Sequence, residues 1–65
     1  MENPKLIDYA YPMMMAEKAL KKAHDYLLDG DYALALDQLK LAMVETRAAS
    51  VATLHMQEKS DALRQ

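Results

Sequence analysis

Apolar residues recur at helical spacing along two separate stretches of the chain. In the first stretch they are Met13, Ala16, Leu20, Ala23 and Leu27, which follow one another at alternating steps of three and four residues. Such steps place side chains on one side of an α-helix. The charged residues between them fall on the other side. This stretch is therefore predicted to be a helix that buries one stripe against a neighbour.

The first helix is predicted to begin near Pro4 and to be kinked. Asn3 can accept hydrogen bonds from the free N–H groups of a helix start, and Pro4 at the first helical position loses no hydrogen bond. Pro12 has no N–H group to donate to the preceding turn, and its ring crowds that turn. We therefore predict a first helix over residues 4–28 with a kink near Pro12.

The sequence Asp29-Gly30-Asp31 is the strongest helix breaker in the chain. Gly30 can adopt the left-handed conformation that ends a helix, and Asp31 can cap the next one. Residues 32–63 contain neither Pro nor Gly and are predicted to form one helix, roughly 48 Å long. Because so short a connection makes the helices antiparallel neighbours, residues 1–65 are predicted to be a single all-α domain, an antiparallel helical hairpin.

The long second helix is apolar on two sides. One row holds Tyr32, Ala35, Leu36, Leu39, Ala42 and Met43, and the other holds Leu34, Leu41, Val44, Ala48, Val51 and His55. The first helix can cover only one of these rows. A 65-residue chain without cysteine also lacks a disulfide framework to stabilise a small core. We therefore expect self-association, most simply a symmetric dimer that forms a four-helix bundle.

The expected contact surface includes a run of three methionines. Met13 serves the contact between the helices, so its two neighbours must face elsewhere, and methionine adapts well to irregular binding surfaces. Filling of the core at a kink is the alternative role for this run. Tyrosine is enriched where binding energy concentrates. The predicted interface residues are Met14, Met15, Leu34, Leu41, Val44, Ala48, Val51, Tyr9 and Tyr11.

The composition limits the cellular locations and the binding partners that we expect for this chain. The net charge is −2 with acids and bases interleaved, so the chain lacks the basic stripe that a nucleic-acid backbone requires. The longest apolar stretch is too short to cross a bilayer, and the N-terminus does not read as a signal peptide. The absence of cysteine fits a reducing compartment. A cytoplasmic protein that contacts no membrane is expected.

The sequence predicts no catalytic, cofactor-binding or metal site. His55 and Glu58 are three residues apart and could reach one metal ion, but bundle metal sites take acids from several helices. His24 has no candidate nucleophile tied to it by spacing. Acidic residues surround the turn, where capping explains two of them and a docking surface for a basic partner is the alternative: Asp25, Asp29, Asp31 and Asp37.

The segment Ala16 to Met43 resembles a single tetratricopeptide repeat, which is a pair of antiparallel helices with small residues where they cross. The matching positions are Ala23, Tyr26, Gly30-Asp31-Tyr32, Ala35 and Ala42. Leu39 stands at a usual aromatic position, and Arg47 stands where the repeat has a proline. The resemblance implies hairpin geometry and, through the family's function, a groove for a peptide.

These features indicate a non-enzymatic protein that binds itself and a further protein. A regulator that binds nucleic acid is the alternative, since a helical hairpin can imitate a helix-turn-helix. Its recognition helix would need polar and basic side chains along one face, whereas the basic residues of the second helix are scattered: Lys40, Arg47, Lys59 and Arg64. In size and in methionine content the chain is similar to small accessory proteins of tailed bacteriophages.

Overall fold

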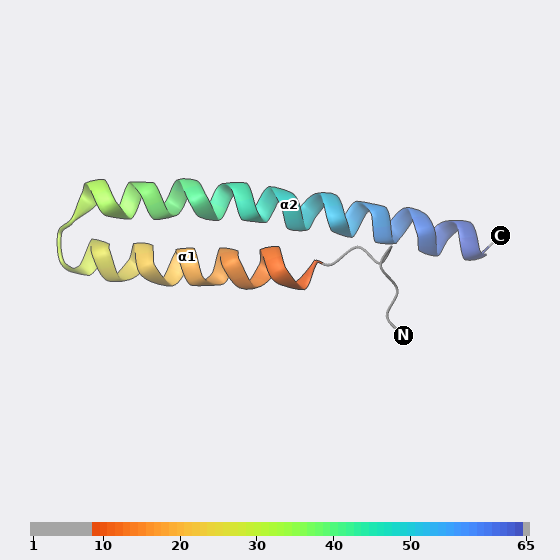
Figure 1. Ribbon diagram of the computed structural model, residues 1–65, viewed down its shortest axis with the longest axis horizontal. Coiled ribbons are helices and arrows are strands. Elements are labelled where there is room, and N and C mark those ends of the chain that lie inside the picture. Colours follow the sequence, from red (N-terminus) through yellow and green to blue (C-terminus); the bar gives the residue numbers. More distant parts are fainter. Residues whose placement is uncertain (1–8, 65) are drawn as a thin grey trace.

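The computed structural model describes residues 9–64 of the chain, and these residues form two helices (Figure 1). Helix α1 is Ala10–Leu28 and helix α2 is Tyr32–Arg64. The two helices run side by side in opposite directions, and α2 continues well past the beginning of α1 (Figure 1). The predicted all-α antiparallel hairpin, with its long second helix, is confirmed.

Helix α1 begins close to its proline. Tyr9 is the N-cap residue, and its carbonyl accepts a hydrogen bond of 3.1 Å from the Met13 N–H group. Pro12 is the third helical residue. The N–H groups of a first turn have no acceptor within the helix, so the missing donor of Pro12 costs nothing and α1 continues through it. The predicted helix over residues 4–8, which a kink near Pro12 would join to α1, lies outside the described residues.

The turn between the helices is made by backbone hydrogen bonds around Gly30. The Asp31 N–H group donates to the Tyr26 carbonyl at 2.9 Å, and the Gly30 N–H group donates to the Leu27 carbonyl at 3.1 Å. This pair of bonds is the Schellman ending of a helix, which requires a left-handed residue. Gly30 supplies that residue with a φ of +76°. The sharp reversal of the chain is therefore a property of local sequence.

Asp31 begins α2. Its side-chain Oδ1 accepts a hydrogen bond of 3.4 Å from the Leu34 N–H group, and its carbonyl accepts one of 3.0 Å from the Ala35 N–H group. The carboxylate also lies at the helix end where partial positive charge collects. The predicted capping role of Asp31 agrees with this geometry.

Small side chains fill the contact between the helices. The buried residues among those described are Pro12 and seven alanines: Ala16, Ala19, Ala23, Ala35, Ala42, Ala49 and Ala52. We call them the alanine seam. Along α1 they follow steps of four, three and four residues, and along α2 they recur mainly every seven. This spacing is the one that keeps two helices in contact as they wind around each other.

The prediction that leucine and methionine share this contact was wrong. Met13, Leu20 and Leu27 are each exposed, with Leu20 at 51%. Ala16 and Ala23 are buried as expected, but the third buried residue of this stretch is Ala19, which the predicted stripe omitted. The stripe was misplaced because a helix rotation of a fraction of a turn exchanges the larger residues for alanine, and alanine lets the backbones approach more closely.

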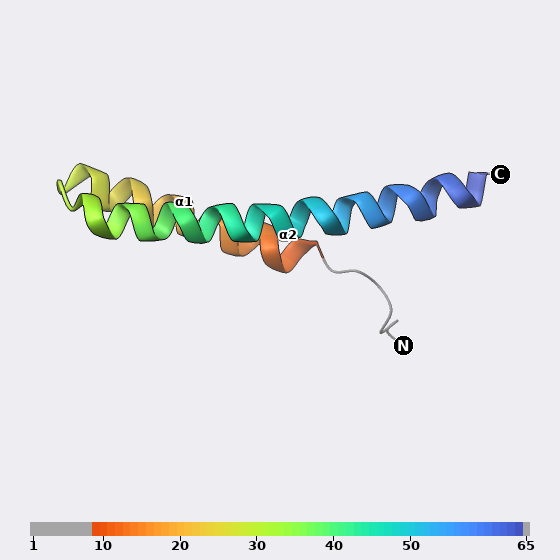
Figure 2. The same ribbon diagram turned by 90° about the horizontal axis from the view of Figure 1, so that it is seen from above.

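The hairpin forms a single layer of helices. Its described shape is 52 Å long and only 13 Å thick, and Figure 2 shows the two helices crossing at a shallow angle when seen from above. A layer one helix thick leaves two broad faces open to solvent.

Replacing Gly30 tests the left-handed turn. A Cβ atom at this position would meet no atom within 4 Å, so only the backbone conformation opposes a side chain. We expect Gly30→Ala to lower the free energy of unfolding by about 1 kcal/mol in urea denaturation. Gly30→Asn should cost less, because asparagine tolerates this conformation. Equal stability of Gly30→Ala and the wild type would contradict the assigned turn.

Enlarging one residue of the alanine seam tests the close packing. Ala23 is 1% exposed, and we expect Ala23→Leu to lower the free energy of unfolding by about 1–3 kcal/mol, because the added atoms push the helices apart. The control is Ala33→Leu, which adds the same atoms at an exposed position of α2. A loss of stability of equal size in the two variants would show that the seam is not tightly packed.

Candidate interaction surface

The large apolar side chains of the hairpin lie on its surface. Within residues 9–64, no leucine, methionine, valine or tyrosine is buried, and most are more than one-third exposed. Soluble monomers rarely expose contiguous apolar surface on this scale. The arrangement of these side chains over the two faces of the hairpin is therefore the feature most informative about function.

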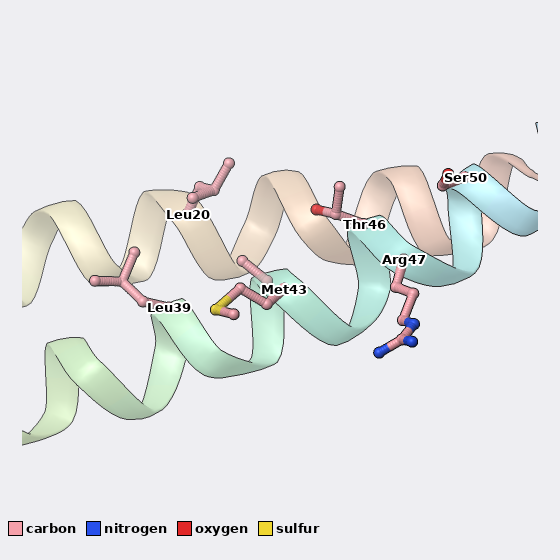
Figure 3. Close-up of a pocket in the computed structure, with 7 residues that line it drawn as sticks. Leu20, Leu39, Met43, Thr46, Arg47 and Ser50 are labelled. Carbon is pink, nitrogen blue, oxygen red and sulfur yellow. The ribbon is translucent and has the colours of Figure 1, made fainter.

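Both helices contribute apolar residues to one face. Leu20 of α1 and Leu39 and Met43 of α2 line a common groove beside the alanine seam, and Figure 3 shows them on neighbouring turns of the two helices. Residues seven positions apart return to the same side of a helix. Met13 and Leu27 lie seven residues before and after Leu20. On α2 the same spacing relates Leu36 to Met43 and Tyr32 to Leu39. The leucine face is this set: Met13, Leu20, Leu27, Tyr32, Leu36, Leu39 and Met43.

The leucine face ends in polar residues toward the middle of α2. Thr46, Arg47 and Ser50 line the same groove, and Figure 3 shows them one and two turns beyond Met43. Thr46 follows Leu39 by seven residues, and Ser50 follows Met43 by seven. The apolar part of the face is thus confined to the half of the hairpin near the turn and to the first turns beyond it, and Arg47 is the only charged residue that lines the groove.

The predicted interface residues of α2 lie elsewhere on that helix. Leu34 and Leu41 immediately precede Ala35 and Ala42 of the seam, whereas Leu36 and Met43 immediately follow them. Successive helix residues are about 100° apart, so the two pairs flank the seam on opposite sides. We call the predicted residues the outer row: Leu34, Leu41, Val44, Ala48 and Val51. All five are exposed.

The predicted interface residues of α1 are spread over several sides of it. Tyr9 lines a groove with residues near the end of the paired region of α2, among them Met56. Met14 lies among charged residues of α1, including Lys18 and Asp25. Tyr11 is exposed and Met15 is half-buried; they immediately precede Pro12 and Ala16 of the seam and so lie on the side of the outer row. Tyr9 and Met14 lie apart from it, so the structure brings only part of the predicted set together.

Sequence reasoning missed the leucine face because it assigned most of these side chains to the contact between the helices. The signal that could have found the face is the spacing of alanine along α2. Ala35, Ala42 and Ala49 recur every seven residues, a regularity that no leucine row of this helix maintains over the same length. Recognising it as the seam would have left Leu36 and Met43 on the surface.

The groups with possible chemistry are separate and exposed. His55 Nδ1 lies 3.9 Å from Glu58 Oε1, and both side chains are more than half exposed. His24 is exposed on α1. Among the described residues, no three histidine or acidic side chains come together as metal ligands. Over the same residues, neither helix contains a segment apolar and long enough to cross a membrane.

Adding a metal ion tests the interpretation of His55 and Glu58 as a solvent-exposed pair that binds no metal. Zinc in proteins takes four ligands, and this pair offers one imidazole and one carboxylate in open solvent. We expect excess Zn²⁺ to leave the thermal unfolding midpoint unchanged, since only a ligand bound by the folded state raises it. A rise in the midpoint that His55→Ala abolishes would contradict this expectation and reveal a metal site.

Comparisons of this chain with protein families, with curated proteins and with solved structures find no match. Its function is therefore inferred from two features of the hairpin, the leucine face of both helices and the outer row of α2.

Proposed function

We propose that this chain is a small non-enzymatic interaction protein that acts as a helical homo-oligomer and contacts a further protein. The observation that carries the proposal is the composition of the core. The seam buries only alanines and Pro12 within the described residues, while most of the leucines and methionines are exposed. Burying a methylene-sized group contributes about 0.8 kcal/mol, and burying a whole leucine about 1.5–3 kcal/mol. Most of the larger contribution is therefore available only through association.

The single-layer shape supports the same proposal. Stable domains are built from at least two packed layers around a shared core, and this hairpin is 13 Å thick. A second copy would supply the missing layer and turn two hairpins into a four-helix bundle. Two apolar surfaces are available for this association, the leucine face and the outer row that the sequence predicts.

A further protein would use the apolar surface that self-association leaves uncovered. Helical partners commonly recognise such a surface through residues spaced three and four apart, and Leu41, Val44, Ala48 and Val51 of the outer row have that spacing. The lack of cysteine is compatible with a cytoplasmic location. In its small size and its methionine content the chain is similar to small accessory proteins of bacteriophages, and we propose that it is encoded by a phage.

Binding to nucleic acid is the alternative proposal, and the charges of α1 speak against it. Lys18, Lys21 and Lys22 share their side of the helix with Glu17 and Asp25. Lys21 Nζ lies 3.7 Å from a carboxylate oxygen of Asp25. Lysines interspersed with acids cannot track a phosphate backbone well. A gel shift that weakens steeply with salt would favour the alternative.

Sedimentation equilibrium of the purified full chain tests the proposed self-association. We expect a mass of at least two chains at micromolar concentration. We also expect the thermal unfolding midpoint to rise with protein concentration, because association stabilises only the folded state. The helical content should fall on dilution below the dissociation constant.

A folded monomer would overturn the proposal. The decisive result would be a sedimentation mass of one chain together with full helical content and a midpoint independent of concentration. Such a result would mean that the alanine seam alone stabilises the hairpin, and that the exposed apolar side chains have no partner among copies of this chain.

A further inference from the structure

The leucine face has the spacing of a surface that can pair with itself. On α1, Met13 and Leu27 lie seven residues to either side of Leu20. A two-fold axis beside Leu20 therefore places Met13 of one copy opposite Leu27 of the other. On α2, Leu36 precedes Leu39 by three residues and Met43 follows it by four, so the same axis brings Leu36 opposite Met43 of the second copy to within one residue.

The proposed two-fold axis passes α1 and α2 at the same position along the length of the hairpin. Leu20 and Leu39 line the same groove, and Figure 3 shows them on adjacent turns of α1 and α2. A single rotation can thus match the rows of both helices at once. The outer row offers a poorer match, because Lys18 and Lys22 flank the seam on that side of α1 beside Tyr11 and Met15. Two copies joined there would bring these lysines to the interface.

The area of the leucine face is sufficient for a dimer. Its members are exposed by fractions that range up to 70% for Met43. At about 200 Å² for a large side chain, the middle of the range for aromatic residues, these fractions amount to roughly 700 Å² for one copy. Stable protein interfaces bury about 600–1,000 Å² on each partner, so the face falls within this range.

Charge decides between the two orientations in which two copies can stack. With the turns at the same end, Arg47 would lie over the beginning of α1 of the second copy. That first turn carries no acidic residue, and a helix N-terminus has partial positive charge. With the turns at opposite ends and the axis at Leu39, Arg47 lies opposite position 31, eight residues before Leu39. The carboxylates of Asp31 and the neighbouring Asp29 of the second copy would then lie near the Arg47 guanidinium group and attract it.

We propose that a second copy of the chain packs antiparallel on the leucine face, with Leu20 and Leu39 at the two-fold axis, the turns at opposite ends, and Arg47 beside Asp31 of the second copy. This proposal rests on the proposed self-association and names the surface that performs it. The outer row stays on the outside of the bundle, where a different protein can reach it.

A pair of matched substitutions tests the surface. Leu20 and Val51 are 51% and 50% exposed, so Leu20→Glu and Val51→Glu introduce the same charge at equally accessible positions. Leu20→Glu places two carboxylates together at the axis, and we expect the dissociation constant measured by sedimentation to rise by about two orders of magnitude or more. Val51→Glu should leave it within a few-fold of the wild type. Dissociation by Val51→Glu and not by Leu20→Glu would overturn the proposal in favour of the outer row.

A distance measurement on the intact dimer tests the orientation without depending on a destabilised variant. The chain has no cysteine, so Leu28→Cys, at a position that is 74% exposed and outside the leucine face, carries a single nitroxide label beside the turn. With the turns at opposite ends, the two labels, each eight residues from the axis, are separated by about 24 Å along the bundle. Turns at the same end would be separated by about 10–20 Å. Spin–spin distances in the shorter range would overturn the antiparallel arrangement.

The role of Arg47 has its own control. Arg47→Glu should weaken the dimer at least tenfold because it meets acidic residues of the second copy, whereas Lys22→Glu makes the same change of charge on the side of the hairpin away from the leucine face and should have little effect. Equal effects of the two variants would overturn the assigned contact. If the wild type were instead a folded monomer, the proposed function itself would fail. A wild-type dimer whose association Leu20→Glu leaves unchanged would refute only the choice of surface.

Discussion

The close approach of two helices through alanine is the constraint on which the rest of this structure depends. The seam residues each offer one methyl group, apart from the ring of Pro12. Helices that touch through such small side chains can pack at the short end of the usual range of distances between axes, about 8 Å. No larger side chain then fits between them, so every leucine and methionine next to the seam must turn toward one of the two faces.

Because the large side chains turn away from the seam, the two faces of the hairpin differ in composition. On the leucine face, Leu20 and its neighbours in α1 meet Leu36 and Met43 of α2. On the opposite face, Leu34 and Leu41 of α2 meet a side of α1 that carries Lys18 and Lys22 as well as Tyr11 and Met15. An apolar surface supplied by both helices suits burial against an identical surface, whereas a mixed surface suits a partner with complementary charge. The proposed dimer uses the first and leaves the second exposed.

The turn contributes both the hairpin geometry and the charge that orients the proposed dimer. Gly30 allows the left-handed conformation, and Asp31 caps α2 through its carboxylate oxygen. The same carboxylate gives this end of the molecule an acidic character, while Arg47 stands at the polar end of the leucine face. The turn thus stabilises the fold and, in the proposed assembly, helps to recognise a second copy.

The sequence alone determined the elements and their order. Two stretches of helical periodicity, a single glycine between aspartates, and a second helix free of Pro and Gly were sufficient to predict an antiparallel hairpin, because capping and chain reversal depend on neighbouring residues. Only the tertiary structure decided which stripe of each helix is inside. Ala19 and Leu20 are adjacent, and periodicity accommodates either of them in the contact; the choice follows from how closely two backbones can pack, which depends on both helices at once. For the same reason the leucine face, which joins residues of α1 and α2 far apart in the chain, became visible only when the two helices were placed side by side.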